Sequence, residues 1–391
     1  MWTDAWNVVA NCNELAQQAE KADPSLFADG DFERKMILGE AIALRAYLQF
    51  DLLRIYAPSP AMNPGERTFI PYVNVYPSYV SNRQTVSYCL NQIISDLKQA
   101  QDILLKVDEK VSWDTRFKKA DKNELVFKSS RGFRLNYYAV TAELARVYLY
   151  AGMLDEAYQQ ADIIIKKKEY FSAITKKSKA IEAIQNGNVK MFDDVIFALY
   201  SPTNLVDWDY KINHAWDGDS YKESFLGLNN DMARARFDED LNSDWRICYQ
   251  MKNRGYYSDY PDYTDYGTLK YYQQPKSYKH AEINNALIPM FRMSEVYYIA
   301  AEAIYKQDLK KAKDFLKAVK QGRGASTSKL ESLTKEDFMD VLVNDALREF
   351  MGEGQTFFMY KRLKQTMKGR KEILALEENM VLPLPESESN I

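Results

Sequence analysis

The sequence predicts a mainly α-helical protein in which helical hairpins of the tetratricopeptide type form a scaffold, with an irregular, aromatic-rich loop lobe. The first observation is a repeat, because residues 142–165 and 297–319 share one pattern at a constant offset of 155 positions. The second is the helical spacing of apolar residues over most of the chain. The third is the loss of this spacing between about 171 and 288, where Asn, Asp, Gly and Tyr become frequent.

Each copy of the repeat reads as a helix, a short polar turn and a second helix. Small residues lie where the two helices must approach closely, and large apolar residues lie beside them. The recurring residues are Ala145, Tyr150, Leu154 and Ala157, which correspond to Ala300, Tyr305, Leu309 and Ala312. Units of this kind bury their apolar faces only by stacking, and a stable stack needs about three or more. We therefore expect the other helices to contribute less regular units.

The N-terminal part of the scaffold is predicted to contain three helices before the first hairpin. The first 56 residues read as two helices, and the second of these carries an apolar stripe. The prolines of 58–64 end it, and an extended segment follows through Pro77. The amphipathic pattern from Val86 to Val107 predicts the third helix.

The C-terminal part begins where helical spacing resumes at Phe291, at the second hairpin. Gly322-Arg-Gly324 reads as a helix stop. A last helix is expected from about Lys335 to Met367. Gly352 and Gly354 should break or kink it.

The whole chain is expected to fold as one domain. Long connections without regular structure inside compact domains are usually functional, so the lobe should carry the distinguishing chemistry. The single domain would span 1–391, with scaffold segments at about 1–56, 84–170 and 289–367 and the lobe at about 171–288.

Composition argues against several classes of protein. The net charge is −3, with 52 basic and 55 acidic residues mixed along the chain, so no nucleic-acid partner is expected. The chain has no run of about 18 or more apolar residues, so no segment is predicted to span a membrane. The three cysteines are far apart and form no CxxC pair, which argues against a disulfide framework.

Catalytic signatures are absent from the sequence. The two histidines, His214 and His280, do not belong to an HExxH motif, which argues against a His-rich zinc site. The chain has no GxSxG elbow, P-loop or GxGxxG motif. Glycosidase carboxylates can lie far apart in sequence, but no acidic pair here has a context that singles it out. We therefore expect no catalytic residues and no cofactor.

Two acidic stretches have side chains that would suit calcium. Asp217-Gly-Asp219 is one, and the series Asp259, Asp262 and Asp265 is the other. Neither follows the spacing of an EF-hand loop. Turn formation and solvated loop charge are the favoured interpretation, so no metal site is predicted.

The aromatic residues of the lobe are the stronger signal for a ligand. Sugars present C–H faces that pack on aromatic rings, and Tyr and Trp combine rigid contact area with a polar group. The alternative is that these rings form the core of a lobe that lacks aliphatic residues. The predicted ligand surface comprises Trp208, Trp216, Trp245, Tyr257 and Tyr263, with the extended segment around Tyr72, Tyr76 and Tyr79 as its neighbour.

Seven segments, taken in order, resemble the SusD/RagB family, the surface nutrient-binding lipoproteins of Bacteroidetes. The most recognisable is the helix at 39–56, which contains Leu44-Arg-Ala-Tyr47 and Phe50-Asp-Leu-Leu-Arg54. The others lie at 2–11, 134–139, 145–152, 291–303, 348–355 and 382–385. Three features depart from the family pattern. Its signal peptide and lipid-bearing cysteine are missing, Thr356 and Met359 replace its usual Arg and Asp, and Tyr56-Ala-Pro replaces its YGGVPL stretch.

Two arginines of the family-like helix, Arg45 and Arg54, lie among apolar residues. A buried arginine needs carboxylate partners. The candidate partners are Glu295, Glu302, Glu349 and Glu353.

The resemblance implies a non-enzymatic binding protein on the outer face of the outer membrane, held there by a lipid anchor that is absent from this chain. It also implies that the protein covers a TonB-dependent, SusC-like transporter and passes an oligosaccharide or polysaccharide to it. A peptide ligand, as expected for RagB-type relatives, is one alternative. A helical-repeat module that binds only protein is a second, and a hydrolase is a third.

Overall fold

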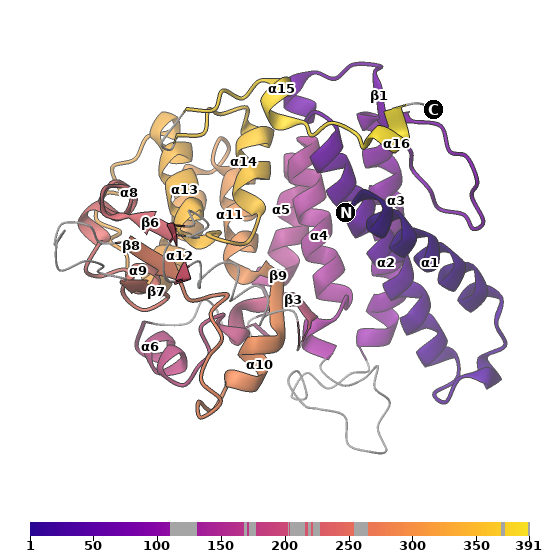
Figure 1. The fold of residues 1–391 in the computed structure, drawn as a ribbon, viewed down its shortest axis with the longest axis horizontal. Helices are drawn as coiled ribbons and strands as arrows, with labels where there is room; N and C mark the ends of the chain where they lie inside the picture. Colours follow the sequence, from indigo (N-terminus) through magenta and orange to yellow (C-terminus); the bar gives the residue numbers. More distant parts are fainter. Residues whose placement is uncertain are drawn as a thin grey trace. The chain divides into compact units, whose positions relative to one another are not determined.

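The computed structural model is mainly α-helical, as the sequence predicts (Figure 1). It describes residues 1–109, 131–167, 170–171, 177–201, 203, 216–217, 220–221, 227–253, 265–368 and 372–389. The chain divides into two compact units. Unit 1 comprises Met1–Ile164 and Phe357–Ile391, and unit 2 comprises Ile165–Thr356. The expectation that 1–391 forms a single domain stays a prediction.

Unit 1 is built on three long helices. They are α1 (Trp2–Lys21), α2 (Asp31–Tyr56) and α3 (Val86–Asp108), and all three were predicted. Helix α2 packs against both of the others (Figure 1). It approaches α3 closely at Gly39, because a Cβ atom there would lie 2.7 Å from Leu104 Cγ. Short strands β1 (Thr68–Ile70) and β2 (Gln84–Thr85) pair in the connection between α2 and α3.

The first predicted hairpin is confirmed as α4 (Tyr137–Ala151) and α5 (Leu154–Ile165). Helix α4 begins at Asn136, whose side chain accepts a hydrogen bond from Ala139 N at 2.9 Å. It ends at Gly152, whose φ of 80° lets Met153 N donate to Tyr148 O at 2.9 Å. Ala145 and Ala157 are fully buried, as close helix packing requires.

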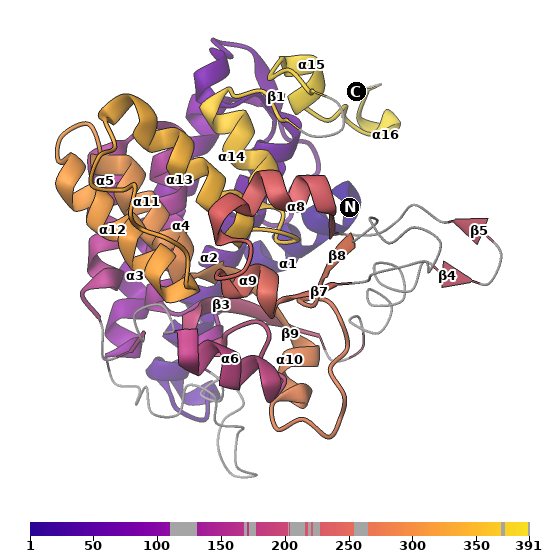
Figure 2. The same cartoon turned by 90° about the vertical axis from the view of Figure 1, so that its left-hand side faces the viewer.

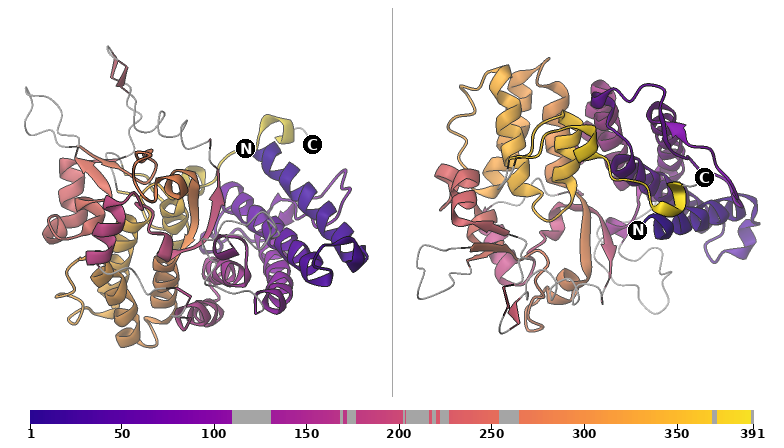
Figure 3. Two further views of the ribbon diagram at one scale, coloured as in Figure 1. Left: turned by 90° about the horizontal axis from the view of Figure 1, so that it is seen from below. Right: turned by 45° about the horizontal axis from the view of Figure 1, so that its top comes forward.

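The second predicted hairpin is confirmed in unit 2 as α11 (Met293–Ile304) and α12 (Leu309–Arg323). Gly324 ends α12 with a φ of 72°, so the predicted helix stop is also confirmed. Helix α13 (Lys335–Glu349) packs on both helices of the hairpin (Figure 3). Ala300 and Ala312 are fully buried.

The last predicted helix is interrupted, as its glycines suggest. Gly352 and Gly354 both have positive φ, at 78° and 76°. They separate α13 from α14 (Gln355–Leu363). Two short helices follow in the tail, α15 (Glu377–Met380) and α16 (Glu386–Ser389).

The predicted lobe contains short regular elements that the sequence analysis did not resolve. Strand β3 (Val195–Tyr200) pairs antiparallel with β9 (Leu287–Arg292). Strands β6, β8 and β7 form a small antiparallel sheet beside α8 and α9 (Figure 2). These elements are β6 (Gly227–Asn229), β7 (Met251–Asn253), β8 (Asp265–Thr268), α6 (Lys177–Gln185), α8 (Asn230–Phe237), α9 (Trp245–Cys248) and α10 (Ala281–Ala286).

The core of unit 2 is crossed by buried ion pairs centred on Glu349. Its carboxylate accepts from Arg292 Nη1 at 2.5 Å, from Arg323 Nη2 at 2.7 Å and from Arg246 Nη1 at 3.0 Å. Burial alone would raise the pKa of Glu349, but the three guanidinium groups hold it well below its ordinary value. Glu349 is therefore ionised and joins α9, β9, α12 and α13.

Two expected ion pairs differ from the sequence analysis. Arg45 does not use a glutamate, because its Nε and Nη2 donate to the carboxylate of Asp96 on α3 at 2.6 and 2.7 Å. Arg54 pairs with Asp51, one turn earlier on its own helix. A carboxylate partner was predicted correctly for both arginines, but the partner is an aspartate of α3 for Arg45 and an aspartate of the same helix for Arg54.

Candidate ligand-binding surfaces

An extended stretch of unit 1, residues 73–76, is held by side-chain amides from two helices. Gln49 of α2 donates to Val73 O at 3.1 Å and accepts from Val73 N at 2.7 Å. Gln17 of α1 donates to Tyr76 O at 2.8 Å and accepts from Tyr76 N at 3.0 Å. Each glutamine thus makes the two hydrogen bonds that a neighbouring strand would make. We call this arrangement the amide clamp.

Tyr72, the residue before this stretch, provides a further anchor. Its hydroxyl donates to Asp96 Oδ2 at 2.5 Å, on the carboxylate that also binds Arg45. Burial, and then the charge of Asp96, raise the pKa of Tyr72 well above its ordinary value. The hydroxyl is therefore protonated and acts as a donor. Of the three predicted tyrosines in this segment, Tyr72 holds the loop in place.

At the end of the clamp and beyond it, the loop presents apolar side chains to solvent. In Figure 1 it is the long loop that follows β1. Tyr79 is 91% exposed and Tyr76 is 40% exposed. Val75 and Val80 beside them are also exposed. Exposed rings on a loop with a fixed base are an arrangement that suits ligand binding.

Trp245, one of the predicted ligand residues, is instead a core residue of unit 2. It is 1% exposed, and its Nε1 donates to Gly322 O at 2.6 Å. The guanidinium of Arg323 lies 4.8 Å from the ring centroid. The ring packs in a cluster with Ala180, Ile184, Val189 and Met191. Its prediction as a ligand contact is wrong, because this part of the lobe uses the indole to fill its own core.

The other predicted residues of the lobe are only partly described. Trp216 lies in β4 (Trp216–Asp217), which pairs with β5 (Ser220–Tyr221). Trp208, Tyr257 and Tyr263 lie outside the described residues. The same holds for Asp219, Asp259 and Asp262 of the acidic stretches. Among the residues that the structure describes, no group of three or more His, Cys, Asp or Glu is placed to hold a metal ion.

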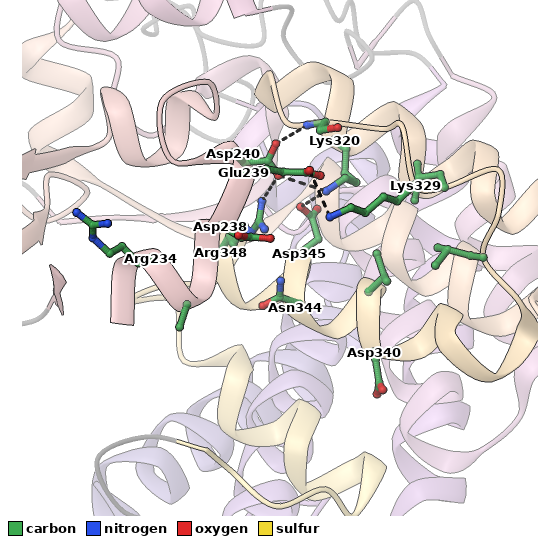
Figure 4. Close-up of a pocket in the computed structure, with 15 residues that line it drawn as sticks. Arg234, Asp238, Glu239, Asp240, Lys320, Lys329, Asp340, Asn344, Asp345 and Arg348 are labelled. Atoms are coloured by element: carbon green, nitrogen blue, oxygen red, sulfur yellow. Dashed lines mark hydrogen bonds and ion pairs between the residues drawn. The ribbon is translucent and has the colours of Figure 1, made fainter. Parts of the chain in front are cut away.

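A pocket of about 410 Å³ lies in unit 2 between α8, α12 and α13 (Figure 4). The 3-10 turn Asp238–Asp240 and the chain from Ser326 to Leu333 complete its walls. No sequence motif marks this pocket, because its charged residues come from four separate segments of the chain. Its lining residues include Arg234, Asp238, Glu239, Asp240, Lys320, Lys329, Leu330, Leu333, Val341, Asn344, Asp345 and Arg348.

Charged side chains are grouped at the floor of this pocket (Figure 4). Arg348 Nη1 lies 2.6 Å from Asp240 Oδ2. The ammonium of Lys320 lies 3.7 Å from Asp240 Oδ2 and 3.9 Å from Asp345 Oδ1. Burial alone would raise the pKa of Asp345, but Arg246 and Lys320 hold it below its ordinary value. Asp345 is therefore ionised at neutral pH.

Two family models match the chain. The model described as "Starch-binding associating with outer membrane" matches residues 1–122, and the model described as "SusD family" matches residues 210–379. Together they span well over half of the sequence and include the helix at 39–56 and the second hairpin. No curated protein matches significantly. No helix within the described residues is long and apolar enough to cross a membrane.

Solved structures share this fold. A SusD superfamily protein from Bacteroides thetaiotaomicron is 23% identical, with a TM-score of 0.74 over 100% of this chain and 83% of that one. A putative sugar binding protein from Bacteroides vulgatus is 22% identical, with a TM-score of 0.73 over 100% and 82%. Surface glycan-binding protein A from Bacteroides uniformis is 18% identical, with a TM-score of 0.65 over 92% and 73%. At these identities the likeness establishes the fold alone.

Proposed function

Because the chain belongs to the SusD/RagB family, we propose that it is a non-enzymatic protein that binds oligosaccharide or polysaccharide at the cell surface. It passes the glycan to a TonB-dependent, SusC-like transporter of the outer membrane. A lipid anchor outside the present sequence holds it to the outward face of that membrane. The observation that carries the proposal is the match of residues 1–122 to a family described as starch-binding and associated with the outer membrane.

Tyrosines at the end of the amide clamp and beyond it support the proposal within those residues. Tyr76 and Tyr79 offer rings to the C–H faces of a sugar, and Tyr hydroxyls can also bond to sugar hydroxyls. The clamp restricts the loop before ligand arrives, so less conformational entropy is lost on binding. A shallow contact of this kind favours weak capture followed by release, which suits delivery to a transporter. Trp208, Trp216, Tyr257 and Tyr263 of the lobe stay proposed contacts in their own right.

The test is binding of the purified chain to a panel of plant, host and microbial polysaccharides, first by affinity electrophoresis and then by calorimetry. Tyr79→Ala should weaken the best interaction by about tenfold, the loss of about 1.4 kcal/mol expected for one stacked ring. Its melting temperature should not change, because the side chain is 91% exposed. Tyr278→Ala is the matched control, since Tyr278 is 41% exposed and lies outside the loop.

Two outcomes would contradict the proposal. Wild-type protein that retains no polysaccharide but binds members of a peptide library would favour the RagB-type alternative. Equal binding by wild type and Tyr79→Ala, with loss in Trp216→Ala, would move the site from the loop to the lobe.

A further inference from the structure

We propose that the pocket between α8, α12 and α13 is a second ligand site that takes a single neutral sugar ring or a similar polyol. The inference rests on the proposed function for the class of ligand. It concerns a different surface from Tyr76 and Tyr79, because every residue that lines the pocket belongs to unit 2. At about 410 Å³ the pocket has the size of a small-ligand site.

Lys320 is the polar group that points to a ligand. The side chain belongs to the last turn of α12 and lines the pocket, and the residue is only 7% exposed. In the described part of the chain its ammonium makes no hydrogen bond, and its ion-pair partners lie 3.7 and 3.9 Å away. An ammonium carries three donors, and both of its ion-pair partners lie beyond hydrogen-bond distance. The Lys320 ammonium is therefore able to donate a hydrogen bond to a ligand in the pocket.

The neighbouring carboxylates are already bound by protein donors. Asp240 accepts from Ser326 N at 2.6 Å through Oδ1 and from Arg348 at 2.6 Å through Oδ2. Asp345 accepts from Arg246 Nη2 at 2.8 Å and from the hydroxyl of Tyr298 at 2.5 Å. Each carboxylate oxygen can accept a second hydrogen bond. The two carboxylates thus keep acceptor capacity beside an ammonium that keeps donor capacity.

This combination selects the chemistry of the ligand. An anion at Lys320 would lie within a few ångströms of Asp240 and Asp345, and their repulsion would offset the attraction. A hydroxyl group accepts from the ammonium and donates to the adjacent carboxylate, so it satisfies both. A ring with several hydroxyls would also meet Asn344 on the wall. Its C–H face would lie on the apolar wall, which is made by Ala235, Leu330, Leu333 and Val341.

The competing explanation is that Lys320 only neutralises the two carboxylates. Lys320→Met keeps most of the length of the side chain and removes the charge. Asp240 would keep Arg348, and Asp345 would keep Arg246. If Lys320 is purely structural, this variant changes stability and leaves binding of any pocket ligand unchanged in the folded protein.

The experiment is saturation-transfer NMR on the full chain with D-glucose, D-galactose, D-mannose and myo-inositol, and with D-glucuronate as the anionic comparator. At least one neutral member should bind, and Lys320→Met should weaken it by about tenfold, as expected for one hydrogen bond to a charged group. Ala235→Trp, which places a large ring at the pocket, should also abolish the signal. Ala61→Trp, at an exposed position of unit 1, is the control for an added tryptophan.

The result for Tyr79→Ala separates the two sites. Retained binding of the monosaccharide by Tyr79→Ala, with loss in both pocket variants, supports the inference. Loss in Tyr79→Ala with full binding by Lys320→Met and Ala235→Trp overturns it. So does tighter binding of D-glucuronate than of every neutral member. Polysaccharide binding without any monosaccharide signal also overturns the pocket assignment while leaving the proposed function intact.

Discussion

At the scale of single residues, Glu349 shows how this chain stabilises a core that contains charge. Three guanidinium groups bond to one buried carboxylate, and each comes from a different element of unit 2. A buried ion pair contributes little compared with an apolar replacement, but breaking one leaves the partner charges unpaired. The stability of the unit 2 core therefore depends on all three arginines and Glu349 being present together, more than on any single ion pair.

Glu349→Gln should lower the free energy of unfolding by about 3–5 kcal/mol, because it leaves three buried arginines short of their shared carboxylate. Chemical denaturation at pH 7 measures the change. Glu331→Gln is the control, since Glu331 pairs with Lys317 with its side chain 79% exposed, and it should cost about 1 kcal/mol or less. Equal effects of the two substitutions would contradict the assignment.

Two buried lysines give stability a predictable dependence on pH. Burial lowers the pKa of Lys190 and of Lys361 to about 7, and Arg54 adds to the effect on Lys361. Unfolding returns both to the ordinary value of 10.5. Between these values the unfolded chain binds more protons than the folded one, so stability rises with pH.

We therefore expect the free energy of unfolding to increase from pH 7 to pH 9, below the range where tyrosines titrate at about 10. Lys361→Met should flatten part of this rise and increase stability most at pH 7, because it removes a buried charge. Denaturation curves at several pH values measure both effects. A wild-type protein that loses stability over this interval would refute the lysine account.

At the scale of elements, the amide clamp shows how helices α1 and α2 determine the conformation of a loop. Within the described residues no strand pairs with 73–76, and the side chains of Gln17 and Gln49 bond to its backbone instead. Since Gln17 and Gln49 belong to long helices that pack against each other, they fix the position of the loop. The exposed tyrosines that follow are positioned by this contact.

Gln17→Ala should speed hydrogen exchange at the Tyr76 amide, which donates to the Gln17 side chain, by about a factor of ten. The melting temperature should change little. Gln18→Ala is the control, because Gln18 is the next residue of α1 and is exposed. Glycan affinity should fall with Gln17→Ala and not with Gln18→Ala. Unchanged exchange at Tyr76 would show that the loop is held by other contacts.

At the scale of the whole molecule, the two units carry different candidate surfaces. Unit 1 carries the family-like helix, the clamp and the exposed tyrosines, and unit 2 carries the ionic core and the pocket. The proposed function requires the chain as a whole to bind a glycan and not to cleave it. Non-enzymatic binding is thus a property to be tested on the complete chain.

Incubation of the purified chain with its best-binding glycan should leave the length of the glycan unchanged by chromatography. The physical reason is that capture and release need only weak contacts, with no acid and base positioned on a glycosidic bond. A sample boiled before incubation is the control. Turnover that survives repurification and disappears on substitution of one carboxylate would establish a hydrolase instead.

Sequence alone predicted the helices well, because helix formation depends on residues three and four apart. The bounds of α3 and of both hairpins follow the apolar spacing closely, and the stops at Gly152 and Gly324 follow from backbone freedom at those positions. The family resemblance came from the same local patterns. Helix bounds, helix stops and the family resemblance can be predicted without knowing which elements pack together.

Only the tertiary structure decided which polar and aromatic groups meet. Trp245 has the sequence context of a ligand residue, yet the packing of α6 and the lobe buries it. Arg45 pairs with Asp96 rather than with a glutamate. Asp240, Lys320 and Asp345 come from three segments and lie together at the floor of the pocket. Burial and ion pairing depend on contacts between residues far apart in sequence. The spacing of apolar residues within one helix does not predict those contacts.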